Sequence, residues 1–297
     1  MKRKYIFSVG VLGIIFMMLG QLSFSINDTL VKEMVIDSKD NMSVINIIFL
    51  RGLITTTFIF LYLKFYEKKN ILDIFKITKY HKRGIYEVLT AMSFFIGLIL
   101  LPVAEVYTLL MTNPFFVTIF AFLFLKEKVG IRRWIAVIIG FIGVLIVINP
   151  QNINFNFLFV FPIIAAVFLT IRDIATKGIA TKTNSFEIIF ITSVLMTLCA
   201  GIGSLFFDFT FRIEYLPNLF TSSIFLTVAY IFSVLTIYYA PLSLTASSRY
   251  SVIVFGIIFG YLILNEIPSL SMIIGATIIS LSGIFVIQRE KELGKIE

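Results

Sequence analysis

Long apolar runs recur along the whole chain, and they constrain its fold more than any other feature. Each run is about 20 residues long, the length at which an α-helix crosses about 30 Å of hydrocarbon. Of the 297 residues, 59% are hydrophobic and 14% are charged, whereas an average soluble domain has about 25% charged residues. Mean hydropathy is +0.99. The sequence therefore predicts an all-α integral membrane protein.

Short polar breaks divide these runs into ten predicted transmembrane helices. The first run follows "MKRK" and resembles a signal peptide, but it is too long, contains Asn27 and Asp28, and lacks a small-residue cleavage site. We therefore expect it to be retained as a helix. The predicted helices span approximately residues 8–31, 43–64, 84–101, 103–125, 131–149, 157–179, 185–207, 219–239, 243–264 and 268–287.

Positive charges predict the topology, because they gather on one side when successive breaks are assigned to alternate sides. The other side carries only Lys32, Lys39 and Arg212. Under the positive-inside rule, the basic side and both termini are cytoplasmic. The net charge of +8 therefore indicates topology and not nucleic-acid binding. The basic side collects Lys2, Arg3, Lys4, Lys64, Lys68, Lys69, Lys76, Lys79, Lys82, Arg83, Lys126, Lys128, Arg132, Arg133, Lys177, Lys182, Arg289, Lys291 and Lys295.

The residue inventory argues against several kinds of site. Cys199 is the only cysteine and His81 the only histidine, so we expect no disulfide framework, no metal site and no cofactor. No Walker motif is present, so ATP hydrolysis by this chain is not expected. An intramembrane enzyme would need a nucleophile–base pair or a metal cluster in the membrane, and it stays as a distant alternative.

A repeat divides the chain into two halves. The segment "LPVAEVYTLLMTNPFFVTIFAFLFLKEKVG" from Leu101 can be laid on "APLSLTASSRYSVIVFGIIFGYLILNEIP" from Ala240, and "NDTLVK" in the first half matches "RDIATK" in the second. Each half, 1–150 and 151–297, holds five predicted helices. Since five is odd, the second half enters the membrane from the opposite side. Inverted repeats of this kind are typical of secondary transporters.

The segment "LPVAEVYTLLMTNPFFVTIFAFLFLKEKVGIRRWIAVIIGFIGVLIVINP" resembles the first repeat of the drug/metabolite transporter superfamily, EamA type. The resemblance covers nearly the whole chain. It implies a ten-helix carrier of the bacterial inner membrane, with a small-molecule substrate in a central cavity between the halves. Within the family, "AMSFFIGLILLPVAEVYTLLMTNPFFVTIFA" and "IRDIATK" look most like the branch of S-adenosylmethionine uptake, with riboflavin importers close by.

An Asn-Pro pair, Asn113 and Pro114, lies in the middle of the predicted helix 103–125. Proline lacks the amide proton that a helix interior needs, and it costs about 3 kcal/mol there. The carbonyl group left without a partner cannot be satisfied by lipid. Transporters use such broken helices to place backbone groups beside substrate. The alternative is a kink that serves only the packing of neighbouring helices.

Four charged residues are predicted inside the membrane. Arg51 and Arg249 lie about a third of the way into their helices, and each costs at least about 2.5 kcal/mol unless it is paired or wetted. The available acids are Asp28 and Asp173. One hypothesis pairs Asp28 with Arg51 near the outside and Asp173 with Arg249 near the inside. The alternative is that both arginines extend to the headgroups while the acids cap helix ends.

Other candidate residues are aromatic or small. Tyr107 and Tyr250 are predicted at a similar depth and could stack on a planar ring. Glu127 and Glu266 follow the apolar runs, where a role in loops or topology is favoured over substrate contact. Gly256 and Gly260 form a GxxxG motif, which we interpret first as internal packing and second as a homodimer contact. The remaining packing glycines are Gly140, Gly143, Gly275 and Gly283.

These features predict a secondary transporter that moves a small organic metabolite by alternating access. An amino-acid-type zwitterion such as S-adenosylmethionine fits best, because the chain offers arginine for a carboxylate, aspartate for a cation and tyrosine for a purine. Riboflavin or another metabolite or drug is the alternative substrate. The expected partners are this substrate and the lipid bilayer, with no nucleic acid.

Overall fold

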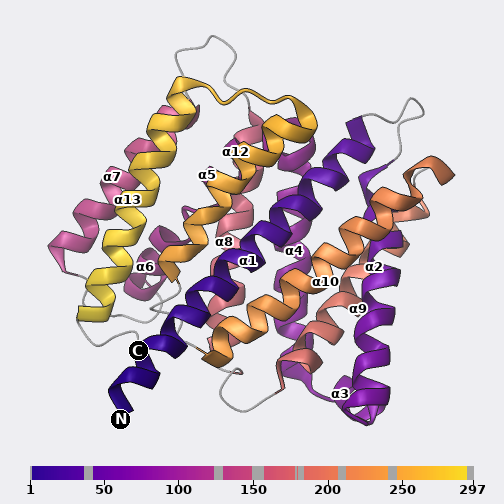
Figure 1. Ribbon diagram of the computed structural model, residues 1–297. Coiled ribbons are helices and arrows are strands. Elements are labelled where there is room, and N and C mark those ends of the chain that lie inside the picture. The colour runs from indigo at the N-terminus through magenta and orange to yellow at the C-terminus, as the bar shows by residue number, and fades with distance from the viewer. Residues whose placement is uncertain are drawn as a thin grey trace.

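The computed structural model describes residues 2–36, 43–123, 130–148, 157–177, 179, 184–206, 212–239 and 246–292. Within these ranges the regular structure is helical (Figure 1). Its longer helices are α1 (Lys2–Ile36), α2 (Val44–Leu61), α4 (Thr78–Leu100), α5 (Val103–Leu110), α6 (Asn113–Leu123), α7 (Ile131–Ile148), α8 (Val160–Lys177), α9 (Ser185–Ser204), α10 (Leu216–Tyr239), α12 (Ser251–Leu264) and α13 (Leu270–Glu292). Shorter elements are η1 (Tyr62–Tyr66), α3 (Ile71–Phe75), η2 (Phe157–Phe159), η3 (Ile213–Tyr215) and η4 (Ala246–Tyr250).

Seven helical stretches in the described part of the chain are long and apolar enough to cross a membrane. Three further apolar helices are shorter. An all-helical membrane fold is thus confirmed, whereas ten crossings in two inverted repeats stay a prediction. The seven spans are Val11–Ile36, Val44–Tyr66, Thr78–Leu100, Val103–Phe120, Phe157–Thr176, Phe186–Ser204 and Ile213–Ser233, and the shorter helices are Trp134–Ile148, Ser248–Leu264 and Leu270–Phe285.

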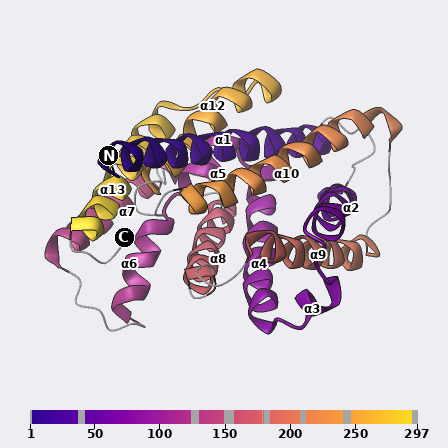
Figure 2. The ribbon, with the colours of Figure 1, turned by 60° about the horizontal axis from the view of Figure 1, so that its bottom comes forward.

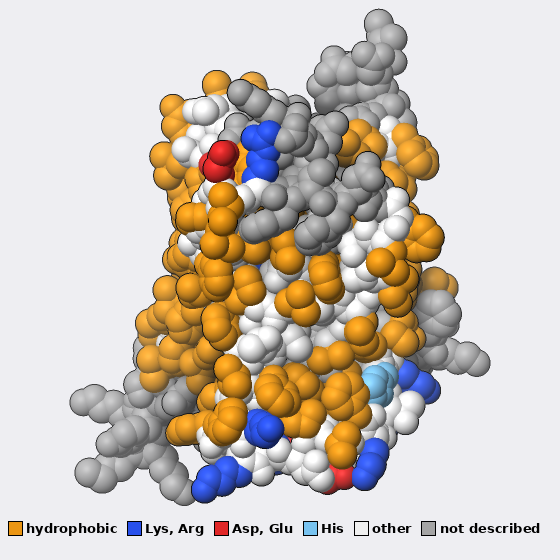
Figure 3. All heavy atoms as spheres, turned by 90° about the vertical axis from the view of Figure 1, so that its right-hand side faces the viewer, with side chains coloured by type: hydrophobic (Ala, Val, Ile, Leu, Met, Phe, Trp, Pro, Cys, Tyr) orange, Lys and Arg blue, Asp and Glu red, His pale blue; other side chains and the backbone are white. Residues whose placement is uncertain are grey.

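Large hydrophobic side chains cover the flank of the molecule (Figure 3). Many of them are more than 40% exposed, among them Leu53, Ile138 and Leu262. A soluble protein of this size would not leave such a surface in water, so these residues suit contact with lipid. In Figure 3, lysine and arginine side chains gather near the lower edge, below this apolar surface.

The helices pack in pairs along the molecule. Helix α1 contacts α10 on one side and α12 on the other, and Figure 2 shows these three helices side by side. Helix α4 contacts α8 and α9, α2 contacts α9, and α7 pairs with α13. Helices α7 and α13 can approach closely because Gly275 has no Cβ atom. A Cβ atom there would lie 2.7 Å from the carbonyl oxygen of Gly143.

Two of the boundaries that differ from those predicted place charge inside a helix. Helix α1 continues to Ile36 instead of ending near residue 31, so Lys32 is helical and buried. Helix α4 begins at Thr78 instead of residue 84, so Arg83 is helical, as was already predicted for Glu87. Charged residues near the end of an apolar run were placed in loops by composition, although their long side chains can be buried when partners are near.

The predicted helix 103–125 is interrupted where the Asn-Pro pair indicated. Helix α5 ends at Leu110, a turn occupies Met111 and Thr112, and α6 begins at Asn113. Pro114 therefore lies in the first turn of α6, where a missing amide proton costs little. The break removes the strain that proline would cause in a continuous helix.

Candidate functional site

The largest group of charged side chains lies where α4, α8 and η4 meet, and we call it the Asp173 cluster. Arg172 of α8 donates from Nη1 to both carboxylate oxygens of Glu87 at 3.1 Å, and from Nη2 to Asp173 Oδ1 at 2.7 Å. Arg83 Nη2 lies 2.8 Å from Glu87 Oε2. Arg249 Nη1 donates to Asp173 Oδ2 at 3.2 Å. Three arginines and two acids thus form one continuous network.

The helix break lies beside this cluster. Asn113 is buried, and its Nδ2 is 3.5 Å from Asp173 Oδ2, the oxygen that Arg249 also contacts. The Thr170 hydroxyl is 3.4 Å from the Asn113 carbonyl oxygen. The structure therefore brings Asn113, Asp173 and Arg249 together, although they are far apart in the sequence.

The cluster is only partly covered. The Arg249 and Asp173 side chains are 29% and 27% exposed, whereas Arg83 and Glu87 are 13% and 14% exposed. Arg83 also donates to the Thr192 hydroxyl at 2.6 Å. The exposed fraction of the side chains thus increases along the network from α4 toward η4. The pairing of Asp173 with Arg249, one of the two hypotheses from the sequence, is present in the structure.

A second group, which we call the Asp28 cluster, consists of Asn27, Asp28, Arg51 and Tyr107. The Tyr107 hydroxyl donates to Asp28 Oδ2 at 2.8 Å, and Asn27 Nδ2 donates to Asp28 Oδ1 at 2.7 Å. Arg51 Nη1 donates to Asn27 Oδ1 at 2.9 Å. Arg51 thus reaches Asp28 through Asn27, a link that the sequence hypothesis did not include.

The Asp28 cluster is buried. Asp28 is 7% exposed and Arg51 4%. The Arg51 guanidinium also lies over the Phe95 ring, 5.1 Å from its centroid, in the geometry of a cation–π contact. Arg51 therefore does not extend to the headgroup region, which was the alternative interpretation of its position.

Lys32, one turn beyond Asp28 on α1, forms a third polar contact. Its Nζ lies 2.5 Å from Glu266 Oε1 and 2.5 Å from the Leu101 carbonyl oxygen. Glu266 Oε2 accepts the Val103 amide at 2.7 Å, at the first turn of α5. Asn265 ends α12 in the left-handed conformation, with φ of 55°. This conformation turns the chain out of the helix immediately before Glu266. Glu266 thus ties the α12–α13 connection to α1 and α5.

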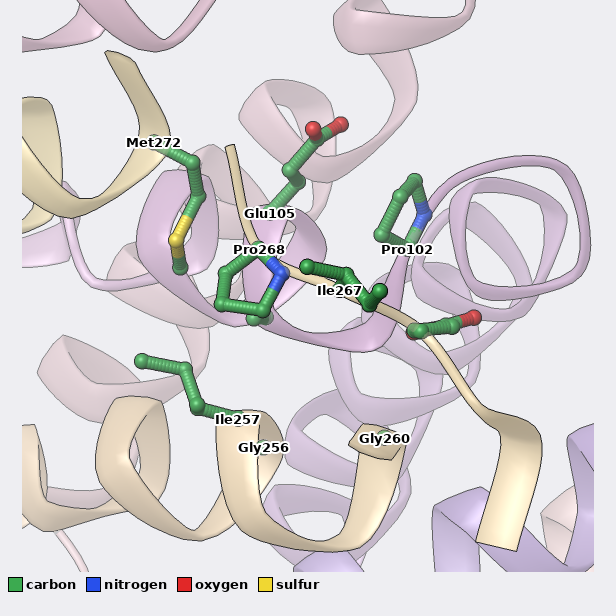
Figure 4. A pocket seen from close by; sticks show the side chains of 10 residues that line it. Pro102, Glu105, Gly256, Ile257, Gly260, Ile267, Pro268 and Met272 are labelled. Atoms are coloured by element: carbon green, nitrogen blue, oxygen red, sulfur yellow. The ribbon is translucent and has the colours of Figure 1, made fainter. Parts of the chain in front are cut away.

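A small pocket adjoins this contact between α5 and α12 (Figure 4). Its lining includes Pro102, Glu105, Ile257, Ile267 and Met272. The enclosed space suits little more than a water molecule, so it is not a chamber for a metabolite.

The candidate tyrosines are both buried in this conformation. Tyr107 is 2% exposed and Tyr250 is 6% exposed. A Cβ atom on Gly256 would contact the Tyr107 ring, and one on Gly283 would overlap the Tyr250 hydroxyl. The two glycines therefore give these rings their space.

The other predicted packing glycines also face neighbours within the chain. Gly140 faces Phe115, Gly143 faces Gly275 and Ile279, and Gly260 faces Glu266. Because Gly256 and Gly260 both face inward, the GxxxG motif is used for internal packing here. A homodimer is left as a prediction without support from these two glycines.

Three members of the Asp173 cluster were not predicted as site residues. Arg83 was assigned to a cytoplasmic loop, and Glu87 and Arg172 were not singled out. The four-residue spacing of Arg83 and Glu87, which places both on one helix face, was the available signal. Glu127 lies outside the described residues. Among the residues that the structure describes, no group of three or more His, Cys, Asp or Glu could hold a metal ion.

Buried ion pairs between apolar helices define the class to which this chain belongs: a multi-pass membrane protein with a charged interior, as membrane carriers have. Residues 11–149 match the sequence model of the EamA-like transporter family. The first half of the chain thus matches a family of transporters, and relatives named as transporters also match, which points to transport of a small molecule rather than to an enzyme.

Similar proteins carry several substrate names. The chain is 26% identical over 283 residues to the S-adenosylmethionine uptake transporter of Rickettsia prowazekii, covering 94% of each chain. It is 34% identical over 96 residues to a riboflavin transporter of Vibrio cholerae, covering 32% of each chain. It is 23% identical over 282 residues to a pseudopaline exporter of Pseudomonas aeruginosa, covering 94% of this chain and 97% of that one.

One solved crystal structure has the same overall fold. The two chains superpose with a TM-score of 0.56 at 12% identity, over 90% of this chain and 98% of the other. At this identity the likeness concerns the fold alone.

Proposed function

We propose that this chain is a secondary transporter of the bacterial inner membrane, and that it imports an amino-acid-type zwitterion such as S-adenosylmethionine by alternating access. The uptake transporter of Rickettsia prowazekii, which matches over 94% of its length, supports this substrate class. The observation that carries the proposal is the partly exposed Asp173–Arg249 pair beside Asn113 at the break between α5 and α6.

The proposed architecture is ten helices in two inverted repeats, 1–150 and 151–297. The helix contacts support it. When each helix of one half is replaced by its counterpart in the other half, the contacts named below map onto one another. The α1–α10 contact corresponds to α8–α4, and α2–α10 corresponds to α9–α4, while α2–α9 and α7–α13 correspond to themselves. In the repeat alignment, the turn at Met111 matches the end of η4 at Tyr250, so both halves change helix geometry at the same place.

The proposed orientation places both termini in the cytoplasm. The start of α1, the end of α13 and the short helix α3 lie at the same end of the molecule (Figure 1). The basic stretch from Lys64 to Arg83 surrounds α3, and such stretches stay on the cytoplasmic side. The Lys32–Glu266 pair then lies toward the outside and holds the two repeats together there.

In this orientation, the structure corresponds to a state that is closed on the outside. The Lys32 side chain is 4% exposed, whereas the Asp173–Arg249 pair nearer the cytoplasm remains partly accessible. Alternating access requires the outer contact to separate and the inner one to close in turn. Tyr107 and Tyr250 would stack on the substrate only after such a rearrangement, because both are buried now.

Riboflavin is the second candidate substrate, and the 34% identity to a riboflavin transporter over 96 residues supports it. The two substrates differ in charge, because riboflavin has a flat ring system without a carboxylate. Uptake of labelled S-adenosylmethionine, riboflavin, amino acids and nucleosides into proteoliposomes distinguishes them. Preferred uptake of S-adenosylmethionine is the expected result, and uptake of riboflavin alone would reject the zwitterion.

A further inference from the structure

The Asp173 cluster contains more positive than negative charge. Among the described residues, the guanidinium groups of Arg83, Arg172 and Arg249 share two carboxylates, those of Glu87 and Asp173. A net positive charge inside a membrane protein is costly unless an anion or water compensates it. The cluster is thus one anionic group short of neutrality.

The hydrogen bonds show where the unbalanced charge lies. Arg172 directs all three guanidinium nitrogens to carboxylate oxygens. Arg83 uses Nη2 for Glu87, Nη1 for Thr192 and Nε for Thr176. Those two arginines balance Glu87 and Asp173 in formal charge, and each of their guanidinium nitrogens has a partner.

Arg249 differs from the other two arginines. In the part of the chain that the structure describes, its one contact with a carboxylate is the 3.2 Å hydrogen bond to Asp173 Oδ2, an oxygen that Asn113 also approaches. It is also the most exposed of the three, at 29% against 17% for Arg172. A planar guanidinium suits a carboxylate, which it can bind through two parallel hydrogen bonds.

We infer that Arg249 binds a carboxylate of the transported molecule, with the Asn113 amide as a neighbouring donor. Arg172 acts as a positioning residue, because it holds Asp173 from the side opposite Arg249. Arg51 is excluded from this role, since it is buried, bonded to Asn27 and stacked on Phe95. The inference rests on the proposed function and assigns the carboxylate of its substrate to Arg249.

Calorimetric binding to the purified full-length chain tests this inference. The ligands are S-adenosylmethionine, S-adenosylhomocysteine, methylthioadenosine and riboflavin. S-adenosylhomocysteine keeps the carboxylate but lacks the sulfonium charge, and methylthioadenosine lacks the sulfonium charge and the whole amino-acid chain, with its carboxylate and its ammonium group. We expect the two carboxylate compounds to bind and methylthioadenosine to bind about 10- to 100-fold more weakly, the range that a charge-assisted hydrogen bond supplies.

Variants locate the effect at one residue. Arg249→Gln should weaken binding of both carboxylate compounds by a similar factor and leave methylthioadenosine unchanged. Arg249→Lys, which keeps the charge but loses the fork, should fall between wild type and Arg249→Gln. Arg132→Gln is the matched control, because Arg132 is exposed on α7. Elution as a single species confirms folding of each variant.

The outcomes separate this inference from the proposed function. Equal binding of methylthioadenosine and the carboxylate compounds, or an Arg249→Gln variant with wild-type affinity, would overturn the carboxylate site while leaving transport of S-adenosylmethionine intact. Binding of riboflavin alone would overturn both. Binding of S-adenosylhomocysteine without S-adenosylmethionine would support the carboxylate site and reject the proposed substrate.

Discussion

The Asp28 and Asp173 clusters are built on two copies of one motif, "NDTLVK" in α1 and "RDIATK" in α8, yet they differ in charge and in exposure. Asp28 accepts from neutral Tyr107 and Asn27, and it is 7% exposed. Asp173 accepts from Arg172 and Arg249, and its side chain is 27% exposed. One copy is sealed, and the other remains accessible.

The difference begins with the residue before each aspartate. Asn27 is neutral and accepts from Arg51, whereas Arg172 adds a second positive charge and recruits Glu87 from α4. The Asp28 side is also closed one turn further on by Lys32 and Glu266. In the proposed account, duplication produced two equivalent positions, of which one closes the outer end and the other binds the substrate.

The largest expected effect is the loss of one partner of the Lys32–Glu266 pair. Lys32→Met leaves the Glu266 carboxylate without its cation, and breaking a buried pair in this way costs about 3 to 5 kcal/mol. The double variant Lys32→Met with Glu266→Gln leaves no uncompensated charge and should recover most of the stability. Thermal unfolding of the purified proteins measures both. A single variant as stable as wild type would show that the pair does not hold this end together.

Arg172→Gln should have the next largest effect, about 2 to 3 kcal/mol, because it removes hydrogen bonds to two carboxylates at once. Arg249→Gln removes one partly exposed contact and should cost less than about 1 kcal/mol. The comparison separates a residue that maintains the cluster from one that serves the substrate. Equal losses of stability in the two variants would remove this distinction within the Asp173 cluster.

The repeated pattern of the sequence was sufficient to predict the helices, whereas it offered the pairing of Asp173 with Arg249 as one of two hypotheses. Apolar length predicts helices because lipid leaves backbone groups no other partner. The Asn-Pro pair also predicted the break, since proline removes a helix hydrogen bond wherever it occurs. These predictions depend on local chemistry, which the order of residues contains directly.

The sequence did not show that Lys32 is buried and that Arg83 is partly buried. Both lie near helix ends that were predicted a few residues too short, so both were assigned to loops. Their partners also come from elsewhere in the chain, since Glu266 is 234 residues from Lys32 and Arg172 joins Arg83 only through Glu87. Only the packing of the helices brings such partners together, and hydropathy contains no information on it.

The smallest expected effect concerns a pair in which the lysine is exposed and the acid is mostly buried, and it provides a reference for the pair of Lys32 and Glu266. Lys69 and Glu187 lie 3.0 Å apart, with Lys69 44% exposed, and this hydrogen bond raises the pKa of Lys69 above its ordinary value of 10.5. A raised lysine pKa stabilises the folded state below that value, and the contribution is lost as pH rises through the folded-state pKa. Lys69→Met should cost less than about 1 kcal/mol at pH 8.

That cost should shrink as pH rises above the ordinary value of 10.5 and vanish once pH exceeds the raised pKa of Lys69, where the amine is neutral in both states. Thermal unfolding at pH 8 and at a pH above the folded-state pKa of Lys69 measures this cost. Lys79→Met is the control, because Lys79 is an exposed lysine of the same basic stretch. A cost as large as that of Lys32→Met would mean that burial does not distinguish these ion pairs.

Reversible cross-linking of the outer contact tests alternating access most directly. Cysteines replace Lys32 and Glu266, and Cys199 is changed to serine. In protein reconstituted into liposomes, a short bifunctional thiosulfonate reagent joins the pair, because it forms a reducible disulfide with each cysteine and releases sulfinate. The account predicts that cross-linked protein takes up no labelled S-adenosylmethionine and that reduction restores uptake, because this end must open once in every cycle. Uptake by the cross-linked protein at the rate of the reduced protein would contradict the account.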